Sequence, residues 1–388
     1  MKGVLLLLGT VGFSYMLNKL LLRFSKNFGV ESRQSQNLVR WASTSKPTTG
    51  GISFYLTFLV GSFVLLLVEP NMLEESSDFF LPLFLSATLA FLIGFADDAY
   101  GTHPNMKLLG QIICGVILLG FGIQIEFFAK MNPQLVWLDY GLTLFWVVGL
   151  MNSLNMLDNM DGVTATIATT IVMGTMVMVI STTGLSPVFM VLITIIGGFV
   201  GFLFWNWRPA KVYMGDTGSM FIGLVLAFFG IQYFWNLNAA PDNTSYVRMA
   251  LIPIMVFIVP IMDTTFVTIS RIRRGISPFQ GGRDHLTHNL ARVGIPEALV
   301  PVTLGIVSLI SGLLAFFAFK LTGEWQRFYS LLFGLYPFTV FALFGILYIR
   351  GMRIMKVKEE IAKQKKAQSQ EPAKTSIVGA EMIGSASN

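Results

Sequence analysis

The sequence predicts an all-α integral membrane protein that crosses the bilayer about eleven times. Of its 388 residues, 54% are hydrophobic and 12% are charged, whereas a soluble domain carries about 25% charged residues. The apolar residues also fall into runs that match the roughly 20 residues needed to cross the hydrocarbon core. Together these observations exclude a soluble globular enzyme.

The expected spans follow the apolar runs, and Asp139 interrupts the fifth of them. In chain order they are centred on residues 3–22, 51–68, 79–96, 107–123, 136–151, 163–181, 186–205, 219–235, 248–269, 297–319 and 329–349. Residues 1–355 therefore form one polytopic membrane domain. Residues 356–388 are basic and polar without apolar periodicity, so we expect a disordered tail.

The basic residues of the connections predict the orientation. The first connection, the ninth connection and the start of the tail are rich in Lys and Arg, whereas the second connection, EPNMLEESSD, carries no positive charge. With eleven spans, all three basic segments fall on one side, which should be the cytoplasm. We expect the N-terminus outside and the C-terminus inside. The net charge of +6 then reflects topology and anionic lipid, and predicts no nucleic-acid partner.

Four polar clusters lie at the ends of the apolar runs, and in this topology all of them face the cytoplasm. Taken singly, each could be an ordinary helix cap or turn. Their convergence on one face favours a single site. The residues concerned are Asp97 and Asp98; Asn155, Asp158 and Asp161; Asp216; and His285 and His288.

Carboxylates and carboxamides are hard oxygen ligands, which suit Mg²⁺ or Mn²⁺ better than zinc. Mg²⁺ is commonly held by one or two carboxylates together with substrate phosphates, and nearby Arg and Lys can clamp phosphate oxygens. The residues alone thus predict a metal-dependent enzyme that handles phosphate at the membrane. They do not identify the donor or the acceptor.

Five motifs, in chain order, resemble those of the polyprenyl-phosphate N-acetylhexosamine-1-phosphate transferases, glycosyltransferase family 4. They are SKPTTGG (45–51), FADDAYG (95–101), NSLNMLDNMDG (152–162), VYMGDTGS (212–219) and GGRDHLTHNL (281–290). The resemblance implies that undecaprenyl phosphate attacks a UDP-N-acetylhexosamine. UMP leaves, and a lipid-diphosphate sugar forms in the bacterial cytoplasmic membrane, which would initiate a cell-envelope polysaccharide.

The resemblance also implies roles for single residues. Asp97 and Asp98 would bind or deprotonate the lipid phosphate, with Lys107 as a phosphate partner beside them. The implied Mg²⁺ ligands are Asp216 first, then Asn155 and Asp158. The implied nucleotide-binding residues are Asn155, Asp158, Asp161 near the uracil, and Lys46 and Tyr213 in the uridine pocket. The implied contacts to the diphosphate or sugar are His285, His288 and Arg283.

The histidine loop indicates which branch of the family the chain is similar to. The peptidoglycan branch has adjacent histidines that help to read a peptide-bearing sugar, whereas here RDHLTHNL separates them. This favours a UDP-N-acetylglucosamine donor without a pentapeptide. A diacetamido-sugar or N-acetylgalactosamine donor stays open, and so does the homodimer common among family members.

Two other classes of protein remain as alternatives. A transporter or flippase would couple ions to carboxylates within the membrane, and Asp139 and Asp263 are the candidates for such carboxylates. A non-catalytic scaffold would be expected to have lost at least one polar cluster, but all are present.

Overall fold

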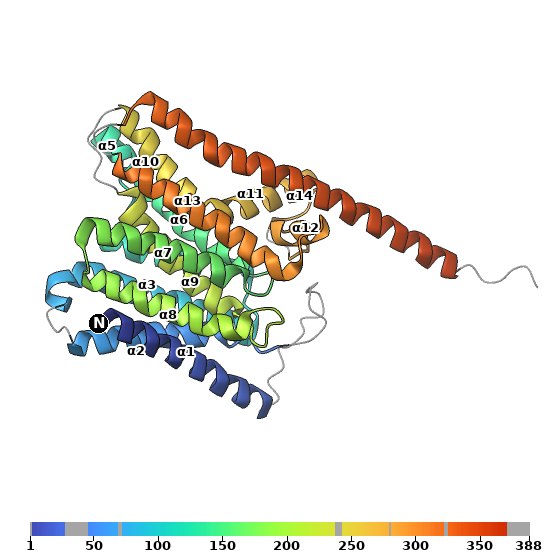
Figure 1. Ribbon diagram of the computed structural model, residues 1–388, viewed down its shortest axis with the longest axis horizontal. Coiled ribbons are helices and arrows are strands. Elements are labelled where there is room, and N and C mark those ends of the chain that lie inside the picture. The colour runs from blue at the N-terminus through green and yellow to red at the C-terminus, as the bar shows by residue number, and fades with distance from the viewer. Residues whose placement is uncertain are drawn as a thin grey trace, which may run out of the picture.

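The chain forms a bundle of long helices in the computed structural model, which describes residues 2–27, 46–68, 72–236, 243–278, 281–321 and 325–370 (Figure 1). No β-strand occurs within these ranges. The elements are α1 (Lys2–Asn27), α2 (Gly50–Val68), α3 (Met72–Tyr100), α4 (Pro104–Gly120), α5 (Phe128–Met131), η1 (Pro133–Leu135), α6 (Val136–Leu157), α7 (Val163–Thr183), α8 (Pro187–Asn206), α9 (Gly215–Gly230), η2 (Ile231–Trp235), α10 (Asn243–Val256), α11 (Ile258–Arg273), α12 (Leu286–Arg292), η3 (Glu297–Leu299), α13 (Val300–Lys320) and α14 (Arg327–Gln370). The predicted all-α membrane class is confirmed.

Each predicted apolar run coincides with one helix, except that the eighth continues from α9 into η2 and the ninth is split between α10 and α11. Among the described residues, nine helices are long and apolar enough to cross a bilayer, and the bent pair α10–α11 would make ten. Helix α4 is apolar but shorter, with 17 residues. Eleven spans therefore stay a prediction. Most of the first connection lies outside the described residues, whereas residues 72–78 of the second connection form the start of α3.

Helix α9 lies at the centre of the bundle, against α2, α3 and α6. It is apolar on all sides, which is the pattern of a helix buried all round, and every residue from Thr217 to Gly230 is buried. Gly223 lets α6 approach closely, because a Cβ there would lie 2.6 Å from the Cα of Met151. The first turn of α9, which carries Asp216, is therefore held firmly at one end of the bundle.

The α10–α11 pair bends by 81°. Pro260 lies in the first turn of α11 and has no N–H to continue the hydrogen bonding of α10, so the helix breaks just before it. The break directs α11 towards α6 and α12. This places Asp263 and Arg271 beside the loop that carries the histidines.

Helix α14 corrects the expectation for the C-terminal tail. It continues without a break from its apolar part to Gln370, so residues 356–370, which we expected to be disordered, are helical. In Figure 1 this helix extends well beyond the other helices, at the end of the bundle where α12 lies. Residues 371–388 lie outside the described part of the chain.

Candidate active site

Asp97, Lys107 and Asp216 meet at one end of the bundle, from the last turn of α3, the first turn of α4 and the first turn of α9. Lys107 Nζ lies 3.1 Å from Asp97 Oδ2 and also contacts Asp216 Oδ2. The side chains keep some exposure, 16% for Lys107 and 29% for Asp216. A lysine shared by two carboxylates at a wet boundary can exchange those partners for a phosphate.

Asp98 faces the start of α9. Its Oδ1 accepts a hydrogen bond from Asp216 N at 3.0 Å, and its Oδ2 accepts from Thr217 N at 2.9 Å and from Thr217 Oγ1 at 2.6 Å. The carboxylate therefore supplies acceptors for backbone donors that a helix start leaves unpaired. Asp98 positions the turn that carries Asp216.

Gly94 makes this contact between α3 and α9 possible, because a Cβ there would lie 2.2 Å from the carbonyl oxygen of Asp216. Sequence reasoning missed both Gly94 and Thr217. A signal for Gly94 was available, since a glycine four residues before Asp98 in a helix lies on the same face.

The NSLNMLDNMDG segment contributes Asn155 and Asp158 from the end of α6. Asn155 Nδ2 donates to Asp216 Oδ1 at 2.7 Å and to Ser219 Oγ at 2.9 Å. Burial, together with the negative charges of Asp216, Asp98 and Asp161, raises the pKa of Asp158 to about 8. We call Asp97, Asp98, Lys107, Asn155, Asp158 and Asp216 the carboxylate–lysine cluster; its single lysine leaves it with excess negative charge.

Asp161 binds the backbone just before the VYMGDTGS motif, and Tyr213 connects that motif to SKPTTGG. Asp161 Oδ2 accepts a hydrogen bond from Ala210 N at 3.0 Å. Tyr213 N donates to Pro47 O at 2.9 Å, and its ring lies under Lys46, whose Nζ is 5.2 Å from the ring centroid. Lys46 and Tyr213 are thus adjacent, as a shared pocket requires.

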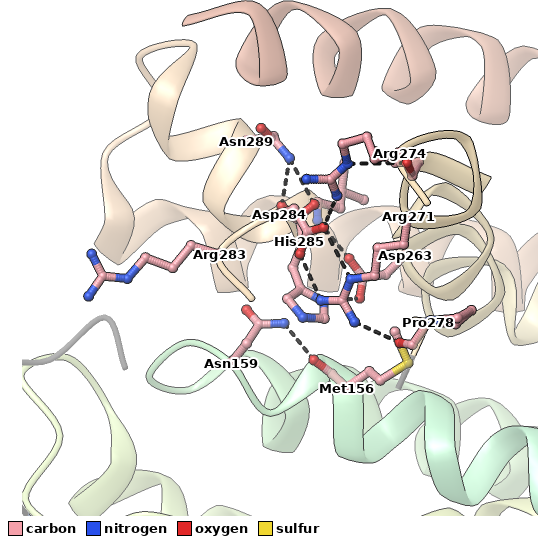
Figure 2. A network of polar contacts seen from close by, with 12 residues as sticks. Met156, Asn159, Asp263, Arg271, Arg274, Pro278, Arg283, Asp284, His285 and Asn289 are labelled. Carbon is pink, nitrogen blue, oxygen red and sulfur yellow. Dashed lines mark hydrogen bonds and ion pairs between the residues drawn. The ribbon is translucent and has the colours of Figure 1, made fainter. Parts of the chain in front are cut away.

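The histidine loop is organised by Asp263 of α11. Asp263 Oδ2 lies 3.0 Å from His285 Nδ1, and Asp263 Oδ1 accepts a hydrogen bond from Leu286 N at 2.6 Å. One buried carboxylate therefore orients the His285 ring and caps α12 (Figure 2). The sequence indicated that Asp263 could be a contact close to the site or a helix-packing hydrogen bond, but it did not identify His285 and Leu286 as the partners.

Asp284 forms ion pairs with two arginines, Arg271 in α11 and Arg274 directly after this helix (Figure 2). Arg271 donates to it from Nη2 at 2.7 Å and from Nε at 3.1 Å, and Arg274 also contacts it. Burial alone would raise the pKa of Asp284, but the hydrogen bonds and charge of Arg271, with those of Arg274, hold it at about 2. This carboxylate stays ionised, and sequence reasoning gave it no role.

His288 is buried, and its ring centroid lies 6.1 Å from that of His285. Burial and the positive charges of His285, Arg292 and Arg283 lower the pKa of His288 to about 3, so it is neutral at physiological pH. Arg283 points away from the other labelled residues in Figure 2. We call Asp263, Arg271, Arg274, Asp284, His285 and His288 the histidine-loop cluster.

Asn159 joins the two clusters. Its Oδ1 accepts a hydrogen bond from Thr287 Oγ1 of α12, and its Nδ2 donates to Met156 O at 2.7 Å. Through this contact and those above, all five sequence motifs are connected at one end of the bundle. The tightest group of predicted site residues contains Asp97, Asp98, Asn155, Asp158 and Asp216. His285 and His288 are separate from this group and form a buried wall.

Oxygen donors suited to a divalent cation are present. Among the described residues, no group of three or more His, Cys, Asp or Glu side chains is arranged to hold a metal ion by itself. Mg²⁺ in phosphate sites usually takes one or two carboxylates and completes its shell with substrate and water. The carboxylates of Asp216 and Asp158 and the amide of Asn155 fit that mode of binding.

Comparison with known proteins gives the family. The model of glycosyl transferase family 4 matches residues 80–234. The chain is 28% identical over 230 residues to a probable undecaprenyl-phosphate N-acetylglucosaminyl 1-phosphate transferase of Bacillus subtilis, covering 58% of this chain and 62% of that protein. It thus spans less than two thirds of this relative.

Two phospho-N-acetylmuramoyl-pentapeptide-transferases are also similar. The Streptococcus gordonii protein is 31% identical over 226 residues, covering 54% of this chain and 67% of that protein. The Streptococcus pneumoniae protein is 32% identical over 234 residues, with coverages of 54% and 70%. The family that the motifs predicted is confirmed: the chain belongs to glycosyl transferase family 4.

Proposed function

We propose that this chain transfers N-acetylhexosamine 1-phosphate, with N-acetylglucosamine as the first choice of sugar, from a UDP-sugar to undecaprenyl phosphate. The observation that carries the proposal is the carboxylate–lysine cluster, in which Lys107 lies between Asp97 and Asp216 while Asn155 contacts the same Asp216. The name of the Bacillus relative supports the transferred sugar and the lipid acceptor.

In the proposed reaction, a phosphate oxygen of the lipid attacks the phosphorus that bears the sugar. The bond from that phosphorus to the bridging oxygen breaks, UMP leaves with the electron pair, and the lipid diphosphate sugar forms. Phosphoryl transfer depends mainly on positioning and on stabilising the charge of the transition state. Lys107 supplies a positive charge at this position, and the firmly held start of α9 fixes Asp216 opposite it.

The two adjacent aspartates have different tasks in this proposal. Asp98 already accepts three hydrogen bonds from Asp216 and Thr217, so it positions the site. Asp97 and Asp216 share Lys107. When Lys107 turns towards the lipid phosphate, Asp97 is the carboxylate that lies next to that phosphate.

Mg²⁺, or Mn²⁺, is part of the proposal, held by Asp216, Asn155 and Asp158. When bound, the cation would neutralise charge on the diphosphate. The negative charges around Asp158 support this assignment, because the same charges that help to raise its pKa to about 8 also attract a divalent cation, which would displace the proton.

The donor would lie between the two clusters. Lys46, Tyr213 and Asp161 are the proposed contacts to the uridine, and His285, His288 and Arg283 those to the diphosphate or sugar. Relatives of both branches match the chain. The separated histidines favour a sugar without a pentapeptide, which is the kind of sugar in the name of the Bacillus relative.

In the proposed orientation, the protein lies in a bacterial inner membrane and this end of the bundle faces the cytoplasm. The support is the continuation of α14 on the same side, where its exposed residues Arg350, Arg353, Lys356 and Lys358 follow the apolar part.

The transporter alternative loses its two candidate carboxylates. Asp139 accepts hydrogen bonds from three consecutive backbone N–H groups, those of Phe127 at 3.1 Å and of Phe128 and Ala129 at 2.8 Å. Asp263 is bound to His285 and to the start of α12. Neither carboxylate is placed to carry an ion across the membrane, so we prefer the transferase.

The test is UMP release by the purified protein with undecaprenyl phosphate, UDP-N-acetylglucosamine and Mg²⁺. We expect UMP that depends on both lipid and metal, and its loss in Asp216→Asn, a variant of nearly the same shape without the charge. A folded wild-type protein that releases no UMP from a panel of UDP-N-acetylhexosamines would contradict the proposal. Release from another sugar only would correct the donor.

A further inference from the structure

Helix α14 packs against α12, the helix that follows the histidine loop, and Gly351 of α14 lies close to Asn289 of α12. A Cβ at this position would lie 2.6 Å from Asn289 Cβ, 2.7 Å from Asn289 Oδ1 and 2.8 Å from Asn289 Cα. These distances are well inside van der Waals contact, and one of the atoms belongs to the backbone. Only glycine, which has no Cβ, fits here without moving α12.

Asn289 is a fully buried side chain that holds the loop which precedes it. Its Nδ2 donates to the carbonyl oxygens of Asp284 at 3.1 Å and of His285 at 2.9 Å, and its Oδ1 accepts from Arg292 Nη1 at 2.9 Å. Figure 2 shows its contacts to the Asp284–His285 segment. Any displacement of Asn289 therefore displaces the backbone of the two residues that anchor the histidine-loop cluster.

Contacts on either side of Gly351 hold the crossing in register. On the N-terminal side of Gly351, the buried Tyr348 packs its ring on Phe266 of α11 with centroids 5.3 Å apart. On the C-terminal side of Gly351, the negative charge of Glu359 acts on Arg292. Arg292 in turn donates to Arg283 O at 2.6 Å. Helix α14 thus contacts both elements that position His285, namely α11 with Asp263 and α12 itself.

We propose that the crossing of Gly351 and Asn289 is a positioning device, through which α14 sets the place of His285 and His288 relative to the carboxylate–lysine cluster. Neither residue touches the reacting groups; both act through the backbone of the histidine loop. The inference rests on the proposed function of that site. It adds a requirement for α14, which lies outside the region matched by the family model.

The test compares Gly351→Leu with Gly334→Leu. Gly334 lies on the same helix, and a Cβ there meets nothing within 4 Å, so it controls for adding a large apolar residue to α14. Misplacing reacting groups by about 1 Å can cost on the order of 100-fold in rate. We expect a loss of this size in UMP release for Gly351→Leu, a smaller loss for Gly351→Ala and wild-type activity for Gly334→Leu.

The kinetic constants separate positioning from general damage. We expect kcat and the KM for the UDP-sugar to change, while the KM for the lipid phosphate stays within about twofold, because Asp97 and Lys107 are held by α3, α4 and α9 rather than by α14. Asn289→Ala removes the hydrogen bonds that link residue 289 to the Asp284 and His285 carbonyl oxygens. Adding Gly351→Leu to this variant should therefore cost less than it does in the wild type, although the leucine still meets the Cβ and Cα of residue 289.

Hydrogen–deuterium exchange of residues 281–293 gives a readout that needs no activity. Faster exchange in Gly351→Leu, but not in Gly334→Leu, is expected. If the wild type releases no UMP, the proposed function fails, whereas this exchange difference still decides whether the crossing holds the loop. Equal exchange and equal activity in the two leucine variants would overturn the inference.

Discussion

The carboxylate–lysine cluster and the histidine-loop cluster use similar side chains in opposite ways. In the first, Asp97, Lys107 and Asp216 are 16–29% exposed, and one lysine serves two carboxylates. In the second, the side chains of Asp284 and Arg271 are only 7% and 3% exposed, and one carboxylate has two arginines. The first has an excess of negative charge, and the second has its charges matched.

This difference indicates which region can exchange partners. Buried ion pairs are costly to break, because a lone charge remains in a dry environment. Partly exposed pairs are weaker, and water or a ligand can replace them. We therefore expect the carboxylate–lysine cluster to rearrange around substrates and the histidine-loop cluster to stay fixed as a wall against which the donor is placed.

The largest expected effect is on catalysis in the first cluster. Replacing Lys107 with Met removes the positive charge between Asp97 and Asp216, and losing one such electrostatic group typically costs on the order of 10²–10³-fold in kcat. UMP release should fall by this amount while the protein still folds. Lys130→Met is the matched control, since Lys130 forms a partly exposed pair with Glu126 near α5, far from α12 in Figure 1. Equal activity of both variants would show that Lys107 takes no part in the reaction.

The next effect is on stability in the second cluster. Asp284→Asn leaves Arg271 and Arg274 without their carboxylate, and losing one member of a buried ion pair costs about 3 kcal/mol or more. We expect a clearly lower Tm in detergent, together with lost activity. Glu126→Gln, in the partly exposed pair with Lys130, should leave Tm almost unchanged. A Tm for Asp284→Asn that matches this control would mean that the cluster is not the rigid wall described above.

The smallest effect, about 2 kcal/mol between pH 7 and pH 5, is a pH dependence of stability that comes from His288. Its pKa is about 3 in the folded chain, against 6.5 for an ordinary histidine, so the unfolded state binds the proton first as the pH falls. The free energy of unfolding should therefore drop between pH 6.5 and about 3, by up to about 1.4 kcal/mol per pH unit. Unfolding curves at pH 7, 6 and 5 would measure the slope.

His288→Asn should flatten that slope, whatever it does to stability at pH 7. His103→Asn is the matched control, because His103 is an exposed residue at the start of α4, and its replacement should leave the slope unchanged. If His288→Asn keeps the full slope, the histidine is not held neutral in the folded chain.

Local patterns determined the membrane class, the positions of the apolar helices and the residue types of the site. Apolar runs of bilayer length form helices because the bilayer leaves backbone groups no other partners. Short motifs such as FADDAYG and VYMGDTGS predicted the family that comparison confirmed. The extent of the terminal helix was not predicted, because residues 356–370 carry no apolar stripe and continue a helix that begins in the membrane.

Only the tertiary structure decided how the site residues divide their tasks. Asp97 and Asp98 are neighbours in the sequence, yet one shares Lys107 while the other caps α9, because successive helical residues point in different directions. Asp263, Arg271 and Gly351 gained their roles only from contacts with residues 13 to 62 positions away in the chain. Spacing within a motif determines which chemistry is available, whereas the packing of distant helices determines which side chain can use it.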